Sequence, residues 1–361
     1  MRIAQVAPLF ESVPPTLYGG TERVVSYLTE ELVRMGHEVT LFASADSVTS
    51  AKLVSPCGNA LRLIDPRYDA LSEHLVEMQL VAEQAEAFDV VHYHLDYLHF
   101  PLAQALDVAN VTTLHGRLDR PELHCLLRHF DRVPLVSISD SQRSPAPWMN
   151  WQRTVHHGLP ESLHTFREKQ GDYIAFLGRV SPEKGIHRAI EIARRVGMKL
   201  RIAAKIDPRD EQFFEEQIVP LLKDPQFEWM GEIGGDAKDE FLGEAKLLLF
   251  PIDWPEPFGL VMIEAMACGT PVIAYPCGSV PEIVDEGVTG FLAHDVDSAV
   301  ALVPRALELD RHAVRSQFEE RFSARRMARD YVRVYERLQR QHDFLGERVT
   351  VSSAVHLEAP E

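Results

Sequence analysis

The chain has 361 residues, of which 45% are hydrophobic and 25% charged, and its formal net charge is −17. This length suggests two domains. The acidic balance argues against nucleic acid as a general partner, because phosphate backbones are bound by basic patches. The 4 cysteines show neither the spacing of a metal site nor the density of a disulfide framework, which favours a cytoplasmic setting.

The sequence also predicts no stable insertion into a membrane. No run of about 18 uninterrupted apolar residues occurs, and Met1 leads directly into a strand-like segment, so we expect no secretory leader. The helical segment 69–87 carries several glutamates, which is the wrong sign for docking on anionic lipid.

Apolar strand-like runs alternate with amphipathic helices along the first half of the chain. A helix is predicted over 21–35, with Thr21 as its N-cap and Gly36 just past its end. The predicted strands are 3–7, 39–43, 90–93, 111–114 and 135–138. This alternation is typical of a parallel sheet covered on both faces, and we assign residues 1–160 to a first Rossmann-like domain.

A second series of the same kind begins at Tyr173. Its predicted strands are 173–178, 200–204, 227–230, 247–250 and 272–275, and the polar segment 158–172 is interpreted as a linker. We assign 172–322 to a second Rossmann-like domain, 323–345 to a final amphipathic helix, and 346–361 to a tail without periodicity that we expect to be mobile. The predicted fold class is α/β, with two doubly wound domains facing across a cleft. Ligands of such folds bind beyond the carboxyl ends of the strands.

The most informative segment is 250–270, FPIDWPEPFGLVMIEAMACGT, which joins a strand to an apolar helix. Glu256 precedes that helix and Glu264 lies inside it, while the N–H groups of Phe258, Gly259 and Leu260 form an anion site at its start. Two acids flanking an anion site suit a ligand with a phosphate core and hydroxyl-rich ends, such as a nucleotide sugar. Alternatively, Glu256 only interacts with the helix dipole and Glu264 lies on a solvated face. However, the sequence neighbours of Glu264 are apolar, and a carboxylate in such surroundings needs a polar partner.

Two further loops follow strands of the two halves. Gly178 to Gly185 reads GRVSPEKG and brings Arg179 and Lys184 to a strand end, where they suit phosphate oxygens. We expect a helix to start there at Ser181 or Pro182. Gly19 and Gly20 follow the first strand and allow a backbone to approach a ligand. Alternatively, the loop 178–185 is a solvated basic turn, and the loop with Gly19 and Gly20 is an ordinary glycine turn.

Histidines mark the ends of two strands in the first half. His115 ends the predicted strand 111–114 and is expected to point into the cleft, and His94 follows the neighbouring predicted strand 90–93. His92 and His94 have the spacing of two metal ligands, with Asp96 close by, but no third ligand has convincing spacing and no Asp-x-Asp element occurs. We therefore predict no metal site.

Glu256-Pro257-Phe258-Gly259-Leu260, followed by Glu264 and the residues up to Val272, resembles the E-x7-E signature of retaining GT-B glycosyltransferases of the family-4 type, glycosyl transferases group 1. The resemblance covers almost the whole chain. It implies a GT-B architecture in which residues 1–160 form the acceptor domain, with His94 a candidate for the acceptor pocket. The same resemblance implies catalytic roles for His115 and Glu256, and donor binding by Gly19, Gly20, Arg179, Lys184, Glu264 and residues 256–260. It also implies that loop 276–282 lies beside the nucleotide, that the final helix crosses back to the first domain, and that the configuration of the sugar is retained.

The predicted function is transfer of a hexose from a nucleotide diphosphate sugar, UDP-glucose or GDP-mannose, to a hydroxyl of a small-molecule, glycan or lipid-linked acceptor, with no metal and no cofactor. A GT-B sugar-nucleotide epimerase and a catalytically silent binding protein remain as alternatives. So does an NAD-dependent dehydrogenase, since Gly19, Gly20 and Asp46 loosely imitate its fingerprint, although the third glycine is absent.

Overall fold

The structure is a computed structural model that describes residues 1–16, 19–63 and 69–355, with the backbone alone described at residue 63 and over 345–355. The last part of the predicted tail, 356–361, lies outside the described residues. The chain divides into two compact units. The first comprises Met1–Ser137, Ala146–Val155 and the chain from Met327 onward, and the second comprises Ile138–Pro145 and His156–Arg326.

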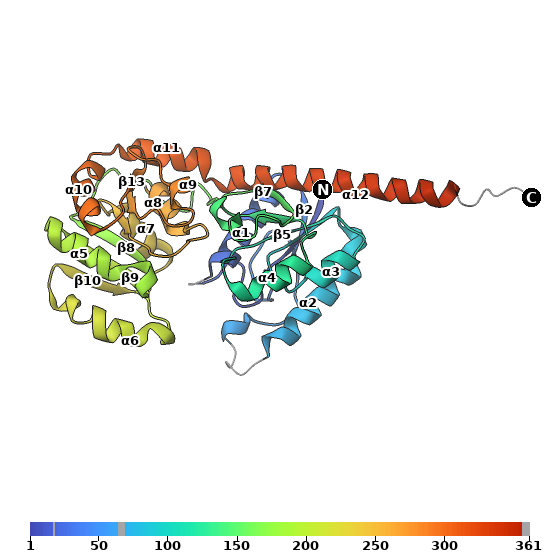
Figure 1. Cartoon of the computed structure of the whole chain (residues 1–361), viewed down its shortest axis with the longest axis horizontal. Coiled ribbons are helices and arrows are strands. Elements are labelled where there is room, and N and C mark those ends of the chain that lie inside the picture. Colours follow the sequence, from blue (N-terminus) through green and yellow to red (C-terminus); the bar gives the residue numbers. More distant parts are fainter. Residues whose placement is uncertain (17–18, 64–68, 356–361) are drawn as a thin grey trace, which may run out of the picture. The chain divides into compact units, whose positions relative to one another are not determined.

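The first unit is built on a seven-stranded parallel sheet in the order β3-β2-β1-β4-β5-β6-β7. Strands β2, β5 and β7 of this sheet are labelled in Figure 1. The strands are β1 Arg2–Val6, β2 Glu38–Phe42, β3 Lys52–Val54, β4 Val90–Tyr93, β5 Asn110–Thr113, β6 Leu135–Ser137 and β7 Trp151–Thr154. Its helices are α1 Gly20–Arg34, α2 Ala70–Gln84, α3 Phe100–Ala105, α4 Pro121–His129 and most of α12 Ala324–Val355. Strand order reverses beside β1, so the loops after β1 and β4 lie at a switch point where such sheets bind ligands.

The second unit has a six-stranded parallel sheet in the order β10-β9-β8-β11-β12-β13. The strands are β8 Tyr173–Arg179, β9 Lys199–Lys205, β10 Phe227–Gly231, β11 Leu248–Phe250, β12 Val272–Ala274 and β13 Gly290–Leu292. Its helices are α5 Ile186–Val196, α6 Glu211–Phe213, α7 Gly235–Gly243, α8 Leu260–Ala267, α9 Val280–Ile283, α10 Val296–Ala306 and α11 Arg311–Arg321. Here the order reverses between β8 and β11, which places the loops after these two strands at the switch point.

The α/β prediction is confirmed, and every predicted strand is present with ends within one residue. The strands that sequence analysis missed, β3, β7 and β13, all lie at sheet edges. β3 and β7 contain no fully buried residue, so they lack the apolar run that marks the central strands. Among the described residues, no helix has the length and hydrophobicity needed to cross a bilayer.

Three helix ends differ from prediction. The N-cap of α1 is Gly19, not Thr21, because the chain turns at φ 139°, a conformation that disfavours any side chain. A helix does start at Pro182, with Ser181 as its N-cap, but it is a short 3-10 helix that ends at Lys184; left-handed Gly185 follows, and α5 begins only at Ile186. Finally, α12 continues past 345 to Val355.

Candidate functional site

The start of α8 is held by the loop 276–282 of the same unit. Ser279 donates its N–H to the Glu256 carbonyl at 2.9 Å and its hydroxyl to the Phe258 carbonyl at 2.8 Å. A Cβ at Gly278 would lie 2.3 Å from the backbone nitrogen and oxygen of Glu256, so only glycine allows this approach. Left-handed Gly259, at φ 80°, then turns the chain into α8. The backbone of residues 256–259 is therefore fixed at the N-terminal end of α8, which is the positive end of the helix dipole.

Lys184 and Glu256 form an ion pair beside this helix start. The Lys184 ammonium lies 2.5 Å from a Glu256 carboxylate oxygen, with side chains 18% and 10% exposed. The same ammonium lies 4.5 Å from the Trp254 ring centroid, which adds a cation–π contact. From the sequence, Lys184 was expected to bind phosphate oxygens and Glu256 the hydroxyl-rich part of the ligand, but in the structure the two side chains neutralise one another. An anion that binds Lys184 must therefore compete with Glu256.

The loops after β8 and β11 are tied together by backbone contacts. A Cβ at Gly185 would lie 2.1 Å from the Pro251 carbonyl oxygen, so the loops touch where only glycine fits. Asp253 donates its N–H to the Glu183 carbonyl at 2.7 Å, and Arg188 donates to the Pro251 carbonyl at 2.8 Å. This close packing is what brings Lys184 to Glu256 across 72 residues of sequence.

Arg179, at the end of β8, is surrounded by carboxylates. Its guanidinium lies 2.7 Å from Glu183, 3.3 Å from Asp207 and 3.9 Å from Asp210. Asp207 and Asp210 follow β9, and sequence analysis did not include them. The feature of the sequence that could have identified them is the group of acidic residues after the second strand of this unit. Arg179 is thus held in place by three acids, and a phosphate would have to share it with them.

Glu264, inside α8, is paired with a residue that sequence analysis also missed. The Lys238 ammonium on α7 lies 2.6 Å from a Glu264 carboxylate oxygen, with side chains 16% and 6% exposed. This is the polar partner that a carboxylate in an apolar helix requires. No local pattern predicted it, because Lys238 lies 26 residues away on a helix of mixed character.

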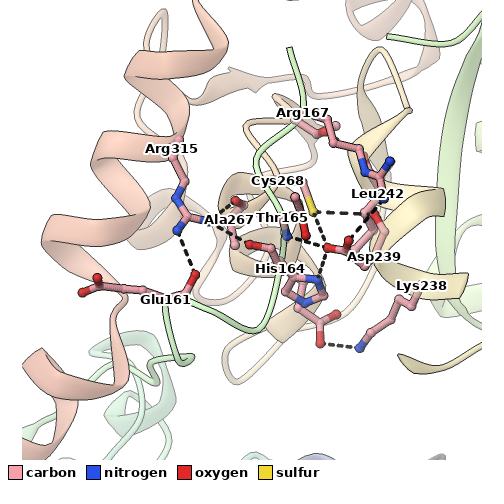
Figure 2. Close-up of polar contacts among 12 residues, drawn as sticks. Glu161, His164, Thr165, Arg167, Lys238, Asp239, Leu242, Ala267, Cys268 and Arg315 are labelled. Atoms are coloured by element: carbon pink, nitrogen blue, oxygen red, sulfur yellow. Dashed lines mark hydrogen bonds and ion pairs between the residues drawn. The ribbon is translucent and has the colours of Figure 1, made fainter. Parts of the chain in front are cut away.

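One group among the described residues has the composition of a metal site: His164, Asp239 and Cys268, whose ligand atoms lie within 4.8 Å of one another (Figure 2). Asp239 is already bonded, however. Its oxygens accept from the Thr165 N–H at 2.7 Å and lie 3.3 Å from His164 Nδ1 and 3.4 Å from Arg167. Burial raises the pKa of the Cys268 thiol to about 12, which opposes the thiolate a metal needs. Asp239 therefore ties α7 to the segment 164–167, while His164 Nε2 is buried without a hydrogen-bond partner.

In the first unit, the structure brings His115 and His94 together. His115 Nε2 lies 2.9 Å from His94 Nδ1, and His94 Nε2 lies 2.9 Å from Gln5 Oε1. The two nitrogens of His92 lie 2.7 Å from the Tyr335 and Thr113 hydroxyls. Each nitrogen of His92 and His94 therefore has a protein partner, which argues against the metal pair considered from their spacing. Burial lowers the pKa of His115 to about 3, so its imidazole is neutral at physiological pH.

The glycine loop after β1 leads directly into α1. Gly19 is the N-cap, Gly20 is the first helical residue, and the Arg23 N–H bonds the Gly19 carbonyl at 3.1 Å. A Cβ at Gly19 would lie 2.8 Å from the Pro15 side chain, so the loop is too tight there for another residue. In the first turn of α1, burial raises the pKa of Glu22 to about 7.

Comparison with known proteins identifies the family. Residues 18–164 match the model of Glycosyltransferase Family 4, and residues 164–323 match that of glycosyl transferases group 1. The chain is 36% identical over 351 residues to D-inositol 3-phosphate glycosyltransferase of Mycobacterium avium (strain 104), covering 77% of this chain and 78% of that one. This chain belongs to the family-4, group 1 glycosyltransferases. A second relative of this glycosyltransferase is the glycogen synthase of Mycobacterium tuberculosis (strain H37Rv), 27% identical over 88% of this chain and 86% of that one.

Solved structures identify the fold of the glycosyltransferase as GT-B. AviGT4, a glycosyltransferase involved in avilamycin A biosynthesis, superimposes with a TM-score of 0.73 at 23% identity, covering 94% of this chain and 98% of that one. Anabaena Alr3699/HepE, solved in complex with UDP and glucose, gives a TM-score of 0.72 at 16% identity, over 93% and 99% of the two chains. Membership of a transferase family favours transfer over the dehydrogenase and epimerase alternatives.

Proposed function

We propose that this glycosyltransferase is a retaining enzyme that moves a hexose from a nucleotide diphosphate sugar to an acceptor hydroxyl, without a metal or another cofactor. The observation that carries this proposal is the Lys184–Glu256 pair, 2.5 Å apart beside the start of α8. A cation, an acid and a helix N-terminus at one point match a ligand that joins a diphosphate to a hydroxyl-rich sugar.

The resting ion pair suggests how the donor is engaged. When the diphosphate arrives, Lys184 exchanges the Glu256 carboxylate for phosphate oxygens, and Glu256 becomes an acceptor for sugar hydroxyls. Arg179 and the N–H groups at Phe258, Gly259 and Leu260 add to the stabilisation of the phosphate. Pro257 restricts the backbone at the turn, and Gly19 and Gly20 admit the donor close to the first unit.

In the reaction, the bond between the anomeric carbon and the β-phosphate oxygen breaks, and a bond to the acceptor oxygen forms on the same face of the sugar. The acceptor proton passes to the leaving phosphate, so the protein supplies no base. Negative charge grows on that phosphate, where Lys184 and Arg179 stabilise it electrostatically. Glu264, whose charge is neutralised by Lys238, accepts hydrogen bonds from the ribose hydroxyls.

His115 contacts the transferred sugar as a neutral hydrogen-bonding group, because burial holds its pKa near 3. His94, proposed for the acceptor pocket, already bonds His115 and Gln5. A direct bond from its ring to an acceptor must replace one of these, so we propose that His94 acts on the acceptor side mainly through His115.

The proposed donors are UDP-glucose and GDP-mannose. The first is supported by the Anabaena protein solved with UDP and glucose. The second is supported by the phosphatidyl-myo-inositol mannosyltransferase of Mycolicibacterium smegmatis (strain mc(2)155), 26% identical over 99% of this chain. The acceptor is a small molecule, a glycan or a lipid-linked sugar, and its identity is a matter for screening.

The test is a donor screen on the purified full-length chain. UDP-glucose, GDP-mannose and ADP-glucose are compared with NAD by thermal shift, since a ligand at 100 times its dissociation constant stabilises by about 2.7 kcal/mol. The stabilising donor is then incubated with candidate acceptors in excess chelator, and nucleoside diphosphate and glycosylated product are measured. We expect one nucleotide sugar to stabilise and to be consumed. Stabilisation by NAD alone, or release of an epimerised nucleotide sugar, contradicts the proposal.

A further inference from the structure

The ammonium of Lys184 lies close to two aromatic rings as well as to the carboxylate of Glu256. It lies over the Trp254 ring, 4.5 Å from the ring centroid, and 5.8 Å from the ring centroid of Phe250. Both distances fall within the range of about 6 Å over which a ring quadrupole attracts a cation. The side chain of Lys184 is 18% exposed, so water weakens these contacts less than it would at the surface. Trp254 is the nearer ring and therefore the stronger partner.

The backbone on both sides of Trp254 is anchored to other loops of the second unit. The residue before it, Asp253, donates its N–H to the Glu183 carbonyl at 2.7 Å. Two residues after it, the Glu256 carbonyl accepts the N–H of Ser279 at 2.9 Å. The ring of Trp254 thus projects from a short anchored segment, whereas the ammonium of Lys184 ends a flexible four-carbon stem. In this pair the tryptophan is the fixed member, and the lysine is the member that it orients.

The two kinds of contact respond differently to an arriving anion. A carboxylate and a phosphate compete for the same N–H donors of the ammonium. The face of an indole ring attracts the cation through its quadrupole and bears no formal charge that an anion would have to displace. The Lys184 ammonium can therefore exchange Glu256 for phosphate oxygens and keep its contact with Trp254. The ring also offsets part of the cost of parting a poorly exposed ammonium from its carboxylate.

We propose that Trp254 is a positioning residue for Lys184, whose ring keeps the ammonium beside the start of α8 while Glu256 gives way to the diphosphate of the donor. The diphosphate as the arriving anion rests on the proposed function. The pairing of Trp254 with Lys184 does not, because it is a contact within the chain. In this role Trp254 acts on the nucleotide only through the charge of Lys184.

Matched variants separate the ring from the charge. Trp254→Leu removes the aromatic face, Trp254→Phe keeps a smaller one, and Lys184→Met keeps an unbranched stem and removes the ammonium. The control is Trp148→Leu in the first unit, where the Arg128 guanidinium lies 4.4 Å from the ring centroid. This control removes a cation–π contact of the same kind from a residue that is not among those proposed to bind the donor.

The experiment is a double-mutant cycle on the full-length chain, with UDP and GDP affinities measured by isothermal titration calorimetry. A cation–π contact contributes a factor of about 2 to 30. Trp254→Leu should weaken the nucleotide that binds by this factor, Trp254→Phe by less, and Trp148→Leu not at all. In the Lys184→Met background, Trp254→Leu should have little further effect. Equal losses with and without the ammonium, or unchanged affinity in Trp254→Leu, overturn the proposal.

Fluorinated tryptophan keeps the measurement decisive if Trp254→Leu does not fold. Fluorine withdraws electron density from the ring face and weakens its contact with a cation at nearly constant shape. Because the chain has 4 tryptophans, Trp254→Phe labelled in the same way corrects for the others. Labelling should weaken nucleotide binding in the parent, but not in Trp254→Phe or Lys184→Met. A loss of the same size in Lys184→Met overturns the proposal.

The same cycle without nucleotide separates this inference from the proposed function. Urea unfolding of the parent, Trp254→Leu, Lys184→Met and the double variant measures the coupling between ring and ammonium directly. We expect a coupling of about 2- to 30-fold in the unfolding equilibrium constant, and its absence overturns the pairing. If the coupling is present but the affinity for neither nucleotide depends on Lys184, the phosphate role of Lys184 in the proposed function fails and the pairing stands.

Discussion

Exchanging each of the two acids for glutamine should separate their roles. Glu256→Gln and Glu264→Gln keep the shape of the side chain and remove its charge. In the resting structure Glu256 neutralises Lys184 at 2.5 Å, so Glu256→Gln releases that ammonium for the diphosphate. Nucleoside diphosphate affinity should therefore stay at the parent level or rise, while transfer falls.

The size of each effect follows from the bond that is lost. A hydrogen bond to a charged group contributes roughly 1.5–3 kcal/mol, or about 10- to 150-fold. Glu256→Gln should lose this factor in kcat, because its carboxylate serves the sugar. Glu264→Gln should lose it in nucleotide affinity, because its carboxylate serves the ribose, and its unpaired Lys238 should add a small loss of stability.

The assay is isothermal titration calorimetry with the nucleoside diphosphate of the active donor, combined with steady-state product formation. Glu191→Gln is the matched control, since it removes a carboxylate 45% exposed and paired with Arg194 on α5 of the same unit. We expect it to behave as the parent. If both variants bind and turn over like this control, neither acid serves the donor. If Glu256→Gln weakens the nucleotide more than Glu264→Gln, the two roles are reversed.

Further outcomes follow from the same structure. Lys184→Ala and Arg179→Ala should each weaken nucleoside diphosphate binding by about 10-fold or more. The control variant is Arg195→Ala, which removes an exposed arginine paired with Asp297. Normal nucleotide affinity in both test variants removes Lys184 and Arg179 from the site. Activity should persist in excess EDTA, and loss that zinc, magnesium or manganese restores would point to the three-residue cluster of Figure 2. Arg311→Met should destabilise the protein to urea by roughly 2–5 kcal/mol, because this buried guanidinium donates to the carbonyls of residues 167, 243, 245 and 268; a change below 1 kcal/mol contradicts this. Burial raises the pKa of Glu22 from 4.5 to about 7, so folding favours its protonated form. Its contribution to the free energy of unfolding is complete below pH 4.5 and is lost as the pH rises through 7, by up to about 3 kcal/mol. In Glu22→Gln the urea midpoint should depend less on pH over this range, and an unchanged pH dependence refutes the assignment.

What the sequence predicted well was determined by neighbours along the chain. The central strands are buried apolar runs, and the turn at Gly259 into an apolar helix is a local event that places Glu256 before α8 and Glu264 within it. Edge strands such as β3 escaped prediction because their side chains are half exposed and show no such run.

The partners of the site residues could not be predicted in the same way. Lys184 meets Glu256 only because parallel strands bring the loops after β8 and β11 to one sheet edge. Lys238 meets Glu264 only because helix α7 packs against helix α8. The burial of Glu264 did indicate that a partner was needed, but not which residue. Tyr335 lies 243 residues from His92, and nothing in its local sequence distinguishes it from a tyrosine that merely packs in the core.

The anomeric configuration of the product tests the central claim most directly. The full-length chain is incubated with its donor and acceptor in excess chelator, and the anomeric proton of the transferred hexose is followed by ¹H NMR before and after transfer. A product that keeps the configuration of the donor, formed with release of one nucleoside diphosphate per sugar, is the predicted result. An inverted product, or no transfer until a metal is added, contradicts the account.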